Sequence, residues 1–213
     1  MDAAGKVYVP DTGNDRIQIF NASNGAFITT WGSSGSGQSQ FSCPWGVVIS
    51  PVNGDFYVAD RCNNRIQIFD SNRVYKTQLG TGVYGSSSTE FAGPQGVAVD
   101  KQGNVYVADQ GNNRVQKCTV SGVNYNCALF AGVTGEWGDD FGHLADSYSV
   151  AVDDSGRVYV ANAGNQRVQV FDSTGAYLTT IGGAWGSNTG QMREPKGVAL
   201  DNQGNVYVTD SRN

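Results

Sequence analysis

The chain has 213 residues, and its 14 lysines and arginines against 19 aspartates and glutamates give a net charge of −5. This balance argues against a nucleic-acid partner, because proteins that bind the phosphate backbone carry a strongly basic patch. No apolar run approaches the length of a transmembrane helix, so no membrane span is expected. The length allows a substantial core, and the 29 glycines fit a fold with many tight turns.

One pattern recurs along the chain, and a tyrosine between apolar residues marks its phase. The copy GNVYVADQGNNRVQKC begins at Gly103, and edited copies begin at Gly5, Gly54, Gly156 and Gly204. The steps between successive central tyrosines are 49, 49, 53 and 48 residues. A fixed step in this range predicts a repeat architecture. The central tyrosines are Tyr8, Tyr57, Tyr106, Tyr159 and Tyr207.

Each complete unit predicts four short strands. The run 105–107 has apolar groups on both faces, which is typical of a strand covered on both sides. It lies between an apolar run at 96–99 and a strand that opens at Arg114, and the fourth strand is clearest at 177–181 of another copy. Four strands in about fifty residues indicate a blade of a β-propeller. The chain therefore divides into units at about 1–31, 46–79, 96–131, 149–181 and 197–213.

The recurring pattern resembles the NHL repeat family of β-propellers. The resemblance is carried by a proline, any residue and a glycine, then GVAVD, a short turn, VYVAD and NNRVQ. It implies an all-β fold of four-stranded antiparallel blades, with six blades in a complete ring. Six blades need roughly 300 residues, so we expect an incomplete ring of about four blades in one domain, 1–213. Uncovered terminal blade faces would be apolar. Either the chain closes as a strained four-bladed ring or it associates with another copy, and we favour self-association.

An acidic residue after the second strand and an arginine that opens the third strand recur together. Either they form a ring of charged ligand contacts, or the carboxylate caps the turn and the guanidinium binds nearby carbonyls. We favour the structural interpretation, because a group present in every blade is what the repeat needs to fold. The residues are Asp11, Arg16, Asp60, Arg65, Asp109, Arg114, Arg167 and Asp210.

The residue between the proline and the glycine changes from unit to unit. It is Trp45, Gln95 and Lys196 in three units, and Tyr148 stands at about the same place in the fourth. In a propeller this point lies at the mouth of the central channel. These four residues are our candidates for ligand contacts, although variable positions are also what an unconstrained surface would show.

The four cysteines fall into two pairs. Cys118 ends a third strand and Cys127 starts the facing fourth strand, so they can lie opposite each other. Cys43 precedes a first strand and Cys62 follows the adjacent second strand, which propeller geometry brings to one face of one blade. Two disulfides predict an oxidising compartment, extracellular or at the cell surface. Four free cysteines in a cytosolic protein are the alternative.

Two functions remain open. The first is a non-catalytic binding or scaffold module that recognises a protein, peptide or glycan on one propeller face. The alternative is a fragment of a propeller enzyme of the lyase, lactonase or hydrolase type. The resemblance also extends to amidating lyases with a multi-histidine zinc site, but His143 is the single histidine here, and it cannot supply such a site. No cofactor, metal site or catalytic residue is predicted, and the sequence favours the non-enzymatic function.

Overall fold

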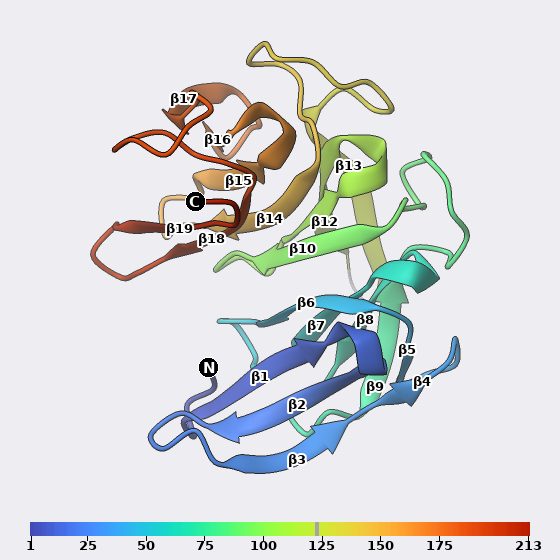
Figure 1. Ribbon diagram of the computed structural model, residues 1–213. Coiled ribbons are helices and arrows are strands. Elements are labelled where there is room, and N and C mark those ends of the chain that lie inside the picture. The colour runs from blue at the N-terminus through green and yellow to red at the C-terminus, as the bar shows by residue number, and fades with distance from the viewer. Residues whose placement is uncertain (122–123) are drawn as a thin grey trace.

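The computed structural model describes residues 1–121 and 124–213, and its regular secondary structure is almost entirely β-strand (Figure 1). The strands form successive antiparallel sheets, each the blade expected from one repeat. Blade 1 is β1 (Lys6–Asp11), β2 (Arg16–Asn21) and β3 (Phe27–Trp31); blade 2 is β6 (Pro44–Ile49), β7 (Phe56–Asp60), β8 (Arg65–Phe69) and β9 (Tyr75–Leu79); blade 3 is β10 (Pro94–Val99), β11 (Val105–Asp109), β12 (Arg114–Ser121) and β13 (Asn124–Gly132); blade 4 is β14 (Ser147–Val152), β15 (Val158–Asn162), β16 (Arg167–Phe171) and β17 (Tyr177–Gly182); blade 5 is β18 (Pro195–Leu200) and β19 (Val206–Asp210).

The remaining elements are short. The helices are single 3₁₀ turns between the second and third strands of a blade, in keeping with the all-β prediction: η1 (Thr12–Asn14), η2 (Arg61–Asn63), η3 (Gln110–Asn112) and η4 (Ala163–Asn165). A small parallel pair, β4 (Ser33–Ser34) and β5 (Gln40–Phe41), lies in the loop between blades 1 and 2. Among the described residues no helix is of the length and apolarity that a bilayer crossing requires.

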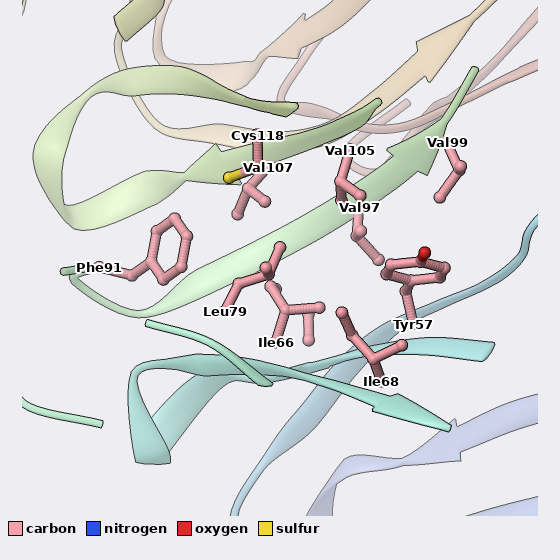
Figure 2. Close-up of a cluster of buried hydrophobic side chains, with 11 residues drawn as sticks. Tyr57, Ile66, Ile68, Leu79, Phe91, Val97, Val99, Val105, Val107 and Cys118 are labelled. Carbon is pink, nitrogen blue, oxygen red and sulfur yellow. The ribbon is translucent and has the colours of Figure 1, made fainter. Parts of the chain in front are cut away.

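The core lies between the blades, because both faces of each middle sheet are covered. One face of a blade presents its central tyrosine to the next blade. Its other face presents to the previous blade the two apolar residues that flank the tyrosine, which are valines except for Phe56 in blade 2. Between blades 2 and 3, Tyr57 and Ile66 pack against Val97, Val105 and Val107 (Figure 2). The same pairing of faces recurs at the other blade interfaces. The continuous apolar runs of the sequence are explained by this two-sided burial.

A hydrogen bond between neighbouring blades also recurs at each junction. The residue after each 3₁₀ turn is left-handed, and its side chain accepts a backbone N–H from the loop that leads into the next blade. Asn64 has φ 50° and accepts from Gly93 at 3.0 Å. Asp15, Asn113 and Gln166 stand at the same position and accept from Cys43, Asp146 and Glu194. Asparagine suits this position because it tolerates the left-handed conformation and carries an acceptor.

The ring is open in the described residues, because no sheet combines strands from the two ends of the chain. Blade 1 lacks an inner strand and blade 5 has only two strands (Figure 1). The outward faces at the two ends expose Val9 and Tyr207, which are 41% and 58% accessible. Self-association through these faces stays a prediction. The exact limits of the repeat units also stay predictions. The predicted unit 96–131 includes residues 122 and 123, which lie outside the described residues.

Candidate binding site at the channel mouth

The four variable residues stand on β-bulges at the start of the inner strands. In β10, Pro94 pairs with Asp109 and Gly96 with Ala108, which leaves Gln95 without a partner in the ladder. The same register shift surrounds Tyr148, Lys196 and, together with Gly46, Trp45. The inner strands thus begin two residues before the glycine position expected from the sequence. A bulge re-aims a side chain, so each strand can present one variable residue at the channel entrance.

The structure brings all four candidates to one cavity. It measures about 520 Å³ and runs between the inner strands β6, β10, β14 and β18, with valines and alanines along its walls. Two glycines keep these strands close: a Cβ on Gly46 would lie 2.5 Å from the Gln95 carbonyl oxygen, and one on Gly96 would lie 2.7 Å from the Ser149 Cα. The cavity therefore has an apolar wall and a mouth of mixed character, within the size range of ligand sites.

Aromatic and cationic side chains alternate around the mouth. The rings of Trp45 and Tyr148 are 6.3 Å apart between centroids. The Arg61 guanidinium lies 5.6 Å from the Trp45 ring centroid, and the Lys196 ammonium lies 5.2 Å from that of Tyr148. Cations at this distance over an aromatic face are attracted to the ring. Each contact favours one orientation of its ring before any ligand arrives.

Of the two uncharged polar residues among the candidates, Tyr148 is the one that can offer a polar contact at the mouth. Gln95 is only 1% exposed, and among the described residues its buried Oε1 has no hydrogen-bond donor. Gln95 therefore lines the channel wall and does not face solvent, although a buried acceptor without a donor costs free energy. Burial raises the pKa of Tyr148, helped by the carboxylates of Asp146 and Glu194. Its hydroxyl thus stays protonated at neutral pH and can donate a hydrogen bond.

The sequence analysis missed two charged residues that contact the candidates from outside the cavity lining, Arg61 and Glu194. Arg61 follows the recurring aspartate of its blade, at a position held by Thr12, Gln110, Ala163 and Ser211 in the other units. This position varies between units although the aspartate before it is repeated, and that contrast is the signal that could have identified Arg61. Glu194 lies 3.7 Å from the Lys196 ammonium and 3.0 Å from the Arg212 guanidinium, between their nitrogens and its carboxylate oxygens. It lies just before the proline of the repeat, at another variable position.

The repeated aspartates and arginines form a buried network behind the mouth. Asp60 is fully buried and accepts hydrogen bonds from Arg65 at 2.8 Å and from the Ser42 backbone at 2.7 Å. Arg65 also donates to the carbonyls of Gly37 and Gln40 in the loop between blades. In blade 3, Asp109 and Arg114 make the corresponding contacts, with the loop carbonyls of 86, 87 and 90. In blade 1 the Asp11–Arg16 pair is partly exposed, and Asp210 accepts the Arg193 N–H.

Blade 4 breaks this pattern, because Asn162 replaces the aspartate. Its Oδ1 accepts the Ala145 N–H at 2.8 Å, and its amide donates to Gln169. Arg167 still donates to the carbonyls of Asp139 and Asp140, but its Nε is buried without an acceptor among the described residues. Burial therefore lowers the pKa of Arg167.

Replacing Asn162 by aspartate should stabilise the chain. The new carboxylate would accept the Arg167 Nε–H and restore the arrangement of blades 2 and 3, where a hydrogen bond to a charged group contributes about 1.5–3 kcal/mol before desolvation. We expect the urea midpoint to rise by an amount equivalent to about 1 kcal/mol. A matched Asn165→Asp variant, on the same 3₁₀ turn, should not stabilise. A lower midpoint for Asn162→Asp would show that desolvation of the carboxylate outweighs the new bond.

A second repeated network closes the turn between the first and second strands. Asp100 accepts the N–H groups of Gln102 and Asn104 at 2.9 and 2.8 Å, and also the Tyr106 hydroxyl at 3.2 Å. The tyrosines of the other units bond in the same way to Asp2, Asp153 and Asp201, with one exception. In blade 2 the aspartate position is Ser50, and Tyr57 instead bonds Tyr125 of blade 3 at 3.0 Å.

The cysteines are linked as two disulfides. Cys43 is bonded to Cys62 with Cα atoms 5.5 Å apart, across the face of blade 2 that carries Arg61. Cys118 is bonded to Cys127, its direct partner in the β12–β13 ladder. The described residues contain no cluster of three or more His, Cys, Asp or Glu arranged to hold a metal ion.

Comparison with known proteins identifies the repeat. The sequence pattern of the NHL repeat matches residues 41–69, 91–118, 149–171 and 192–213. No curated protein sequence matches the chain. Among solved structures, virginiamycin B lyase from Staphylococcus aureus superposes with a TM-score of 0.66 at 12% identity, over 99% of this chain and 61% of the lyase.

Other structural neighbours have different functions. A gluconolactonase from Xanthomonas campestris gives a TM-score of 0.69 at 14% identity, over 99% of this chain and 67% of its own. A chain of the nidogen–laminin complex gives 0.65 at 12% identity, over 92% and 65%. The chain spans about three fifths of the length of the lyases. At these identities the likeness concerns the fold, and together with the four matched repeats it shows that this chain is an NHL-repeat β-propeller protein.

Proposed function

We propose that the chain is a non-catalytic binding module that recognises a peptide or a protein segment at the channel mouth. The observation that carries this proposal is a pair of cation–π contacts, between Arg61 and Trp45 and between Lys196 and Tyr148. Tryptophan, tyrosine and arginine are the residues that dominate binding energy in protein interfaces. Because each contact already favours one orientation of its ring, less side-chain entropy is lost on binding.

The channel wall supports recognition of an inserted side chain. Its valines and alanines leave an apolar space of about 520 Å³ behind the mouth, large enough for one anchor residue of a partner. The two disulfides support a place in an oxidising compartment, extracellular or at the cell surface.

The Trp45→Ala variant should lose binding. A displayed library of random peptides can be selected on the oxidised chain, and the affinity of a selected peptide measured by calorimetry. We expect Trp45→Ala to weaken binding at least about tenfold, equivalent to about 1.4 kcal/mol. The control is Trp137→Ala, since Trp137 is 77% exposed and does not line the cavity. Equal losses in both variants would contradict a site at the mouth.

The alternative is an enzyme of the lyase or lactonase type, and the observation in its favour is the fold shared with such proteins. The channel residues described here include no convergent metal-binding set. A purified chain that retains stoichiometric zinc and turns over a lactone or lyase substrate, with activity lost on chelation, would favour the enzyme and overturn the binding module.

A further inference from the structure

A second cavity lies away from the channel, between blades 2 and 3 on the face that carries the turns between first and second strands. It measures about 490 Å³ and is lined by the 50–55 turn, by β9 and by the ends of β12 and β13. Four departures from the repeat meet there. Ser50 replaces the turn aspartate, Asp55 stands where blade 3 has Asn104, Lys76 faces Asp55, and Tyr125 projects from the longer hairpin of blade 3.

The cavity exists because the β12–β13 hairpin is longer than its counterpart. In blade 4 the tight 172–176 turn packs directly on blade 3: the Ser173 carbonyl oxygen lies 3.3 Å from the Lys117 ammonium. A Cβ on Gly175 would lie 2.2 Å from the Phe130 carbonyl oxygen. In blade 3 the strands run on past this point, with eight residues in β12 and nine in β13. The Cys118–Cys127 disulfide links the two strands of this hairpin. The cavity lies between the hairpin and blade 2.

Several polar side chains of this cavity have hydrogen-bonding groups that are not fully used. The Lys76 ammonium lies 2.6 Å from Asp55 Oδ2, and among the described residues it has no other acceptor. Asn53 donates to the same oxygen, and Asp55 Oδ1 has no donor in the part of the chain that the structure describes. The hydroxyls of Tyr57 and Tyr125 bond each other, and whichever one donates, the proton of the other is uncommitted.

The charges define the kind of ligand. Asp55 and Lys76 neutralise each other, so the cavity carries no net charge to attract an ion. Burial and the Tyr125 hydroxyl raise the pKa of Tyr57, so this group stays a neutral hydroxyl. Val52 and Val120 line the same cavity and are 55% and 48% exposed. An apolar rim beside paired donors and acceptors suits a ligand whose own hydroxyls both donate and accept.

We propose that this cavity, which we call the Tyr57–Tyr125 pocket, binds a neutral sugar unit of a glycan. One sugar hydroxyl would donate to Asp55 Oδ1, its neighbour would accept from Lys76, and a third would accept the free tyrosine proton. The apolar face of the sugar ring would lie on Val52 and Val120. The hydrogen-bonding groups of Asp55, Lys76, Tyr57 and Tyr125 named above belong to side chains, which favours a sugar over an extended peptide paired with the backbone of β9. The pocket is separate from the channel mouth, so the two proposals stand independently.

The test uses the oxidised chain labelled with ¹⁵N and a panel of neutral trisaccharides: maltotriose, cellotriose, mannotriose and triacetylchitotriose. At least one trisaccharide should shift the amide signals of the 50–55 turn and of Tyr125. The shifts should saturate as the sugar concentration rises, and the curve gives the dissociation constant. Tyr125→Phe should raise that constant at least about fivefold, because it removes one of the paired hydroxyls. A Lys76→Met variant should do the same.

The matched control is Tyr106→Phe. Tyr106 holds in blade 3 the repeat position that Tyr57 holds in blade 2. Its hydroxyl bonds Asp100 and lies outside the pocket, so sugar affinity should stay the same. The proposal is overturned if no trisaccharide shifts these signals, or if the shifts map elsewhere. It also fails if Tyr125→Phe and Tyr106→Phe behave alike, or if the pocket signals respond to extended peptides and not to sugars.

Discussion

The Asp109→Ala variant should lose about 3–5 kcal/mol of its free energy of unfolding. Asp109 is fully buried, and its carboxylate accepts the Ala92 N–H at 2.7 Å and the Arg114 Nε–H at 2.8 Å. Removing it leaves the Arg114 guanidinium buried without its counter-charge, and an unpaired buried charge is strongly destabilising. Arg114 also holds the loop between blades 2 and 3. Urea denaturation followed by tryptophan fluorescence measures the loss.

The natural control is Asp11→Ala, since blade 1 carries the same pair at the surface. The side chains of Arg16 and Asp11 are 40% and 17% exposed, against 4% and 0% for Arg114 and Asp109. Water can replace the lost carboxylate at Arg16, so we expect a loss below about 1 kcal/mol. Similar losses for the two variants would show that burial does not set the strength of the network.

Removing the Cys43–Cys62 disulfide by a double substitution to serine should cost about 3 kcal/mol. The bond closes a loop between residues 19 apart, and that closure restricts the unfolded chain. The corresponding removal of Cys118–Cys127 should cost less, because those residues are 9 apart and the hairpin already pairs them. Urea midpoints of the oxidised proteins compare the two. A larger loss for the Cys118–Cys127 variant would contradict the loop-length explanation.

The fold could be predicted largely from the sequence, because each strand pattern is repeated in phase. A single apolar run with a central tyrosine is ambiguous, but five such runs at nearly constant steps leave one architecture. The positions of Trp45, Gln95, Tyr148 and Lys196 at one cavity follow from the same phase. The bulge that turns them toward the mouth was not predicted, because it arises from pairing of the proline with a residue on the next strand.

Contacts between unlike positions of different blades could not be read from the repeat. The Tyr57–Tyr125 bond joins residues 68 positions apart and depends on a longer hairpin and a missing aspartate at once. The cation–π contact between Arg61 and Trp45 requires the bulge and the 3₁₀ turn to face each other. The unpaired Nε of Arg167 follows from one residue, Asn162, but its cost depends on burial that the sequence does not specify.

The alternation of blade faces gives the molecule a direction. Each blade turns its central tyrosine toward the next blade, and the apolar residues on either side of that tyrosine face the previous blade. The outward faces at the two ends are therefore unlike: Val9 marks one and Tyr207 the other. A two-fold symmetric dimer would bring like faces together and would not reproduce the native pairing. Any association that does reproduce it is head to tail, so it either closes into a ring of copies or continues as a filament.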